Sequence, residues 1–194
     1  MMQMHQSAPP FERKPVPEAV DLHTLFHRLN NQLGIILANA EVAGTPDQVF
    51  RALMTNEVEK WWSISGVYRL KDWKADLRTQ GYWSVTVALH DGKLLNEWGE
   101  ICEVDEPSKI VLTRRFGTNP LLGERETTLT YRLEPTARGT LVTVREEGFL
   151  GRPAAAFGNA ENWEKVLSWL DDHLSRKQAS DVCEPRTAGS KGKR

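Results

Sequence analysis

Apolar and polar residues alternate with a period of two through the middle of the chain. In residues 81–89 the apolar positions from Trp83 to Leu89 share one face, and Asp91-Gly92 then forms a typical hairpin turn. Similar strand-like runs follow at 94–104, 110–116, 126–133 and 141–149, joined by short turn sequences. Short strands joined by tight turns predict a curved antiparallel sheet.

Before these strands lies a short helix with a well-defined start. Thr45 and Gln48 have the spacing of a capping box, and Pro46 falls in the first helical turn. The apolar face of this helix covers barely three turns, too short for stability in isolation, so we expect it to dock on a larger element. The adjacent pair Trp61-Trp62 follows within eight residues of that face.

Two further amphipathic helices are predicted, one near each end. From Pro153 an apolar stripe of about twenty residues runs to Leu174, and a shorter stripe predicts a helix over about 18–31. We therefore expect an N-terminal extension (1–34), one domain (35–176) and a disordered tail (177–194).

Composition and charge narrow the class of protein. The 194 residues, 40% of them hydrophobic and 26% charged, fit one globular domain with a sizeable core. A formal net charge of -1 gives no field that would attract nucleic acid or an anionic membrane surface. No apolar run reaches the length of a membrane span and no signal peptide is recognisable. With only Cys102 and Cys183 as cysteines, a cytoplasmic location is the simplest expectation.

Several segments together resemble a known family. The pair Trp61-Trp62, "DLRTQGYWSV", "GEICEVDEPSKIVLTRRF", "GTLVTVREEGF" and "NWEKVLSWLDDHL" are similar, in order and spacing, to the activator of heat-shock-protein-ninety ATPase family. That family belongs to the START-like, or SRPBCC, superfamily. The resemblance covers about residues 35–175 and implies an α+β helix-grip fold. In that fold a curved antiparallel sheet wraps around a long C-terminal helix, two short helices follow the first strand, and a hydrophobic cavity lies between sheet and helix.

The implied cavity suggests a set of ligand-binding residues, although large aromatic side chains fill ordinary cores equally well. Trp61 and Trp62 would wall or cap the cavity. The candidates for ligand binding are Trp62, Trp83, Trp98, Glu100, Arg114, Phe116, Tyr131, Glu146, Phe149, Phe157, Trp163 and Leu167.

Three charged residues fall on strand positions that we expect to face inward. If Trp98 and Cys102 point into the domain, the period of two turns Glu100 inward, and the same reasoning applies to Arg114 and Glu146. Unpaired charges are costly in an apolar interior. Either Glu100 and Arg114 form a buried ion pair or a bulge turns them outward, or Arg114 holds a ligand that carries a carboxylate.

Metal and cofactor motifs are not recognisable. His23 and His27 stand at i and i+4, but no third ligand lies near them in the sequence, and no glycine-rich phosphate loop precedes a helix. We expect neither a metal ion nor a cofactor.

The function favoured by these features is binding of a small hydrophobic or amphipathic molecule, without catalysis, by a monomer or a homodimer. A cyclase- or dehydratase-type enzyme is the first alternative, with Glu146, Glu100 or Tyr131 as the proton-transfer group. An interaction with a heat-shock ATPase, implied by the family resemblance, is the second. The predicted helix over about 18–31 could cover the cavity or mediate self-association.

Overall fold

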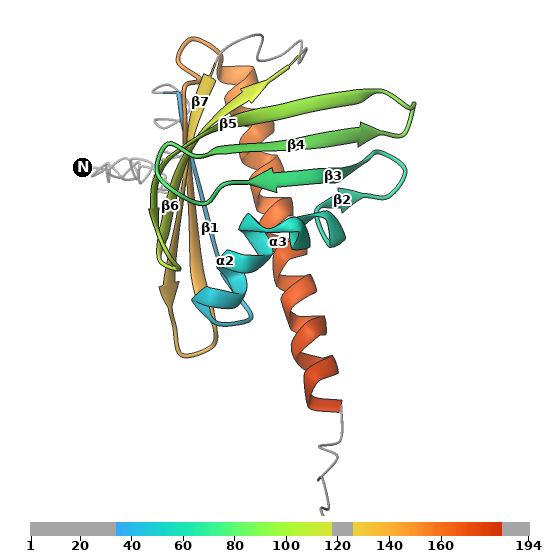
Figure 1. Ribbon diagram of the computed structural model, residues 1–194, viewed down its shortest axis with the longest axis vertical. Helices are drawn as coiled ribbons and strands as arrows, with labels where there is room; N and C mark the ends of the chain where they lie inside the picture. The colour runs from blue at the N-terminus through green and yellow to red at the C-terminus, as the bar shows by residue number, and fades with distance from the viewer. Residues whose placement is uncertain (1–33, 118–125, 184–194) are drawn as a thin grey trace, which may run out of the picture.

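The computed structural model describes residues 34–117 and 126–183, which form one antiparallel sheet, two short helices and one long helix (Figure 1). The strands are β1 (Ile35–Val42), β2 (Ser63–Ile64), β3 (Tyr68–Ala75), β4 (Tyr82–Leu89), β5 (Leu94–Asp105), β6 (Lys109–Phe116), β7 (Glu126–Pro135) and β8 (Thr140–Glu147). The helices are α2 (Pro46–Met54), the 3-10 helix η1 (Asn56–Lys60) and α3 (Pro153–Cys183).

Strands β2 to β8 form a meander, and the first strand, β1, pairs with the last, β8. The spatial order is β1-β8-β7-β6-β5-β4-β3-β2, and every neighbouring pair is antiparallel. Figure 1 shows β3, β4 and β5 running across the view and β1, β6 and β7 running almost upright, so the sheet is strongly curved, with α3 along its length. The α+β helix-grip fold expected from the sequence is confirmed.

The long helix buries the apolar stripe that the sequence predicts. Its side chains from Ala156 to Leu174 that belong to the stripe are at most partly exposed, and Trp163, Val166 and Leu170 are 1% exposed or less. Burial of several large apolar side chains, each contributing roughly 1.5–3 kcal/mol, fixes α3 against the sheet.

The two short helices lie where the sequence places them. The Thr45 hydroxyl accepts a hydrogen bond from the Gln48 backbone N–H, and the Gln48 side chain accepts one from the Thr45 N–H, so the capping box is present. Val49, Phe50 and Leu53 are buried. Trp61, just after η1, is 5% exposed and donates its indole N–H to the Ala52 carbonyl at 3.0 Å, which ties η1 to α2.

The long helix extends further than the sequence predicts. The disordered tail was expected from residue 177, but α3 continues to Cys183. The predicted helix over about 18–31 lies outside the described residues and stays a prediction. None of the described helices has the length and apolar character needed to cross a membrane.

Candidate functional site

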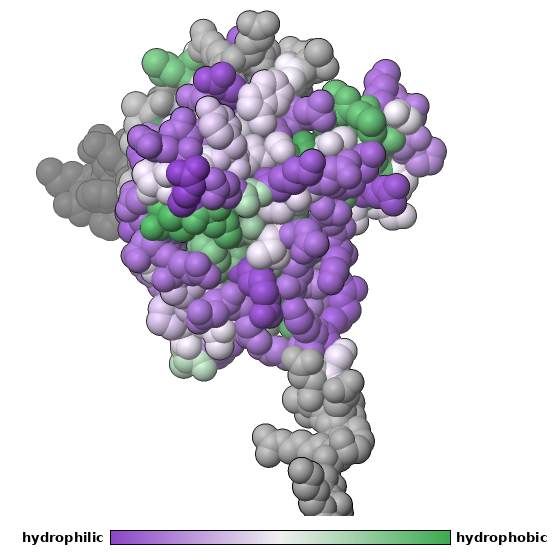
Figure 2. All heavy atoms as spheres, viewed as in Figure 1, coloured by the Kyte–Doolittle hydropathy of each residue, from purple (hydrophilic) through white to green (hydrophobic). Residues whose placement is uncertain are grey.

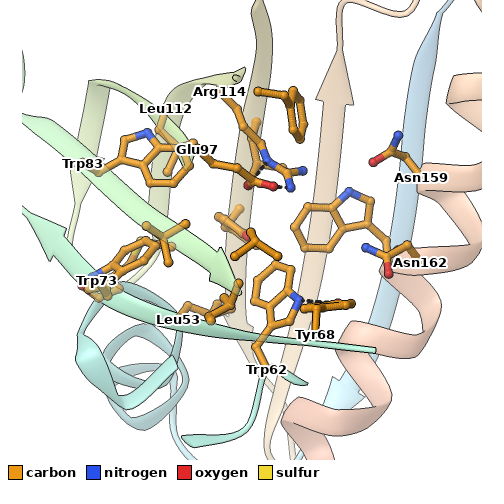
Figure 3. A pocket seen from close by; sticks show the side chains of 18 residues that line it. Leu53, Trp62, Tyr68, Trp73, Trp83, Glu97, Leu112, Arg114, Asn159 and Asn162 are labelled. Carbon is orange, nitrogen blue, oxygen red and sulfur yellow. Dashed lines mark hydrogen bonds and ion pairs between the residues drawn. The ribbon is translucent and has the colours of Figure 1, made fainter. Parts of the chain in front are cut away.

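A cavity of about 220 Å³ lies between the concave face of the sheet and α3 (Figure 3). Strands β3 to β7 form one wall, the end of α2 contributes Leu53 and Met54, and α3 contributes Asn159, Asn162 and Trp163. The remaining lining residues are Trp62, Tyr68, Leu70, Trp73, Trp83, Val85, Val87, Glu97, Leu112, Arg114, Phe116, Leu129 and Tyr131. The cavity is thus mostly apolar, with a few polar groups.

Four tryptophans form two opposite sides of this cavity. Trp73 and Trp83 stack with their ring centroids 5.6 Å apart, and Trp62 meets Trp163 edge to face at 5.5 Å. Figure 3 shows Trp73 and Trp83 on one side of the cavity and Asn159 and Asn162 of α3 on the other. Two aromatic pairs at these spacings form walls suited to a flat apolar molecule.

Every one of these indole N–H groups is bonded to the protein. Trp73 donates to the Met54 carbonyl at 3.1 Å and Trp83 to the Thr113 carbonyl at 2.8 Å. Trp62 donates to the Tyr68 hydroxyl at 3.1 Å, and Trp163 donates to Glu146 Oε2 at 2.8 Å. The rings are therefore held in place, and they present carbon rather than a free donor to the cavity.

Arg114 lies at the polar end of the cavity between two carboxylates. Its Nε and Nη2 donate to Glu97 Oε2 at 3.0 and 2.8 Å, and its Nη1 donates to Glu146 Oε1 at 3.4 Å. The guanidinium also stacks on the Phe116 ring, 4.2 Å from the centroid. Burial alone would lower the pKa of Arg114, but the neighbouring Glu97 and Glu146 outweigh it and raise that pKa. Arg114 is thus a permanent cation whose charge is already balanced.

Glu146 lies behind the cavity and is fully buried. It accepts hydrogen bonds from the Thr127 hydroxyl at 2.8 Å, from the Trp163 indole and from Arg114. All three of these partners are hydrogen-bond donors, as a carboxylate oxygen requires. Glu146 therefore fixes Arg114 and Trp163 in their positions facing the cavity.

Tyr131 brings a free hydroxyl to the cavity. The residue is 3% exposed, and its hydroxyl has no hydrogen-bond partner among the described residues. Among the described residues, every fully buried polar side-chain atom has a hydrogen-bond partner. Because the Tyr131 oxygen has none, it is not fully buried and is accessible from the cavity. Burial raises the pKa of Tyr131, with Glu146 and Glu97 adding to the rise. The phenol therefore stays neutral and can donate or accept a hydrogen bond.

Six of the residues named from the sequence line this cavity: Trp62, Trp83, Arg114, Phe116, Tyr131 and Trp163. Phe149, Leu167 and Glu146 are buried but do not line it. The side chain of Phe157 lies outside the described part of the structure. Of the three candidates for proton transfer, Tyr131 alone is in contact with the cavity.

The predicted orientation of β5 is wrong. Trp98 is 39% exposed, and Glu100 and Cys102 lie with it on the outer face of the sheet. The residues that face inward are Glu97, Gly99 and Ile101. Gly99 explains why this set of residues faces inward, because a Cβ at position 99 would lie 1.8 Å from the Thr113 carbonyl oxygen and 2.8 Å from Trp83 Nε1. The close contact between Trp83 and β6 requires a residue without a side chain at position 99.

Glu97 is the most important residue that the sequence analysis missed. It takes the role that we expected of Glu100, because it pairs with Arg114 from the inner face of β5. The glycine two residues further along the strand is the signal that could have identified the inner face. Tyr68, Trp73, Asn159 and Asn162 were also missed. The first two lie on β3, whose apolar pattern is interrupted, and the two asparagines lie on α3 but are not among the apolar residues of its stripe.

No three His, Cys, Asp or Glu side chains within 34–117 and 126–183 converge in a way that could hold a metal ion. His23 and His27 lie outside these ranges.

Comparisons with known proteins agree with this architecture. The family model described as "Activator of Hsp90 ATPase homolog 1-like protein" matches residues 43–175. A solved protein of Chromobacterium violaceum superposes with a TM-score of 0.63 at 22% identity, covering 73% of this chain and 96% of its own. One from Rhodobacter sphaeroides gives a TM-score of 0.65 at 18% identity, with 74% and 93% covered. Both similarities establish the fold alone. No curated protein matches this sequence.

Proposed function

The chain belongs to the Activator of Hsp90 ATPase homolog 1-like family, and from this premise we propose that it binds a small, largely apolar molecule between the sheet and α3. The observation that supports this proposal is the cavity itself. Four tryptophans wall it, and hydrogen bonds from their indole N–H groups to other residues hold the rings in place. The space between the rings is not filled by the chain.

The walls also favour a ligand. Apolar ring surfaces of the tryptophans face a partly open space that the chain does not fill. Covering such surface with an apolar ligand contributes roughly 25 cal/mol per Å² removed from water.

The size of the cavity restricts the ligand. Cavities of roughly 150 Å³ with apolar walls can hold benzene. The cavity here, about 220 Å³, therefore suits a molecule with one or two rings and a short polar extension. The partly exposed side chains of Trp62, Tyr68, Asn159 and Asn162 mark the side on which such a molecule would enter.

A fluorescent apolar probe tests this proposal. 6-Propionyl-2-(dimethylamino)naphthalene, a two-ring molecule that is neutral at pH 7, should bind the wild-type protein with increased fluorescence and raise its melting temperature. Val85→Phe places a larger side chain in the cavity and should weaken binding at least tenfold. The matched variant Val111→Phe, on the outer face of β6, should bind like the wild type. Absence of binding, or equal binding by Val85→Phe, would contradict the proposal.

An interaction with a heat-shock ATPase, which the family's description names, stays a prediction for this chain. The same holds for the oligomeric state and the cytoplasmic location.

A further inference from the structure

We infer that the molecule bound in this cavity carries a protonated amine, an inference that rests on the proposed function. The observation behind it is the charge balance at the polar end of the cavity. Arg114 contributes one positive charge, and Glu97 and Glu146 contribute two negative charges. Among the described lining residues no other side chain is charged at neutral pH, so the site has a net charge of about -1 before a ligand enters.

Both carboxylates accept hydrogen bonds from N–H or O–H donors of the protein. Glu97 Oε2 accepts two N–H groups of Arg114, and the oxygens of Glu146 accept from Thr127, Trp163 and Arg114. Burial raises the pKa of Tyr131, so the phenol is neutral and adds no charge to the site.

A carboxylate ligand held by Arg114, one of the expectations from the sequence, is disfavoured by the same contacts. Nε, Nη1 and Nη2 of Arg114 each donate to a carboxylate of the protein already. An anion placed beside them would lie close to Glu97 and Glu146 in a site with little water, where like charges repel strongly.

The arrangement that repels an anion offers a cation several partners. Glu97 Oε1 has no hydrogen-bond partner among the described residues, and its side chain is only 17% exposed. The free hydroxyl of Tyr131 lines the same cavity. The indole rings of Trp83 and Trp62 supply the π faces to which a cation is attracted.

These contacts define a ligand class. The apolar body would lie between the tryptophan pairs, and an ammonium group would donate to Glu97 Oε1 and interact with the ring faces. Figure 3 shows Glu97 and Arg114 together at one end of the cavity, between Trp83 on one side and Asn159 on the other. An arylalkylamine has this shape and charge.

Three ligands of one shape test the inference on the wild-type protein. They are 2-(1-naphthyl)ethylamine, 2-(1-naphthyl)ethanol and 3-(1-naphthyl)propanoate, which at pH 7 are a cation, a neutral molecule and an anion. Isothermal titration calorimetry should show the amine binding about tenfold more tightly than the alcohol, as expected for one charge-assisted hydrogen bond, and the carboxylate binding most weakly. If the alcohol or the carboxylate binds as tightly as the amine, the amine inference is wrong while the cavity function stands. If none of the three binds, both proposals fail.

A matched pair of variants then assigns the preference to Glu97. Glu97→Gln should reduce the preference for the amine over the alcohol to about twofold or less while retaining alcohol binding. Glu100→Gln, on the same strand but on the outer face, should keep the tenfold preference. A tenfold preference retained in Glu97→Gln would overturn the assignment. The wild-type ranking decides the ligand class even if Glu97→Gln does not fold.

Discussion

At the scale of single residues, Arg114 and Glu146 depend on each other. Arg114 is 8% exposed and Glu146 is fully buried, with 3.4 Å between Nη1 and Oε1. A buried carboxylate that loses its cation is left uncompensated, and breaking such a pair by removing one partner costs about 3–5 kcal/mol.

Arg114→Met should therefore lower the free energy of unfolding by about 3 kcal/mol, measured by urea denaturation at pH 7. The double variant Arg114→Met, Glu146→Gln should be more stable than the single one. A neutral amide can still accept the Trp163 N–H, and it leaves no charge buried. A single variant within about 0.5 kcal/mol of the wild type would show that this pair does not hold the site.

Whether a site residue could be predicted from the sequence depended on how clearly the pattern of its strand shows which residues face inward. In β6 and β8 a run of alternating apolar residues fixed the inner face, and Arg114 and Glu146 were correctly placed inward. In β5 apolar residues occur on both faces, and the large Trp98 suggested the wrong one. The deciding feature, the contact of Trp83 with Thr113 across Gly99, joins three strands and is not visible in any one of them.

At the scale of elements, η1 is connected to the second half of α3 through Glu57. This carboxylate accepts from Lys177 Nζ at 2.7 Å, lies 2.9 Å from His173 Nε2, and pairs with Arg51 of α2 at 3.3 Å. Burial opposes its ionisation, but the hydrogen bonds from Lys177 and His173 and the nearby cations lower the pKa of Glu57 to about 2. Three helical elements thus meet at one buried anion.

The depressed pKa predicts a contribution to acid stability. A carboxylate with a folded-state pKa of about 2, below its ordinary 4.5, stabilises the fold above pH 4.5. That stability is lost as the pH falls from 4.5 towards 2. Glu57→Gln should reduce the free energy of unfolding by about 2 kcal/mol at pH 7, and the difference from the wild type should shrink towards zero near pH 2.

Urea denaturation at several pH values between 2 and 7 measures this difference. The exposed Glu164→Gln on α3 serves as the control and should follow the wild type at every pH. A gap between Glu57→Gln and the wild type that stays constant with pH would contradict the role assigned to the Glu57 carboxylate.

Helix boundaries set by neighbouring residues could be predicted from the sequence, whereas a boundary that involves distant contacts could not. The start of α2 follows from local residues, because Thr45, Pro46 and Gln48 make the cap among themselves. The end of α3 does not. Lys177 reaches Glu57, 120 positions earlier in the chain, and no pattern within the expected tail indicates that partner. Lys177, the first residue of the expected tail, is therefore part of α3, which ends at Cys183.

At the scale of the whole molecule, a curved sheet and one helix line the cavity. Figure 2 shows hydrophilic residues over most of one face, with hydrophobic colour in a few areas, one of them at the end of the β4–β5 hairpin. There Leu94 is 56% exposed. The largest group of aromatic side chains faces inward to the cavity. This distribution agrees with a protein whose main recognition surface is internal.

The indole N–H signals in a ¹H–¹⁵N correlation spectrum test that claim most directly, with 2-(1-naphthyl)ethanol added in steps. The chain has seven tryptophans, of which Trp62, Trp73, Trp83 and Trp163 line the cavity. Binding between sheet and α3 should shift these four signals and leave that of Trp98, on the outer face, unchanged. No shift at saturating ligand, or a shift of Trp98 without the other four, would contradict the account.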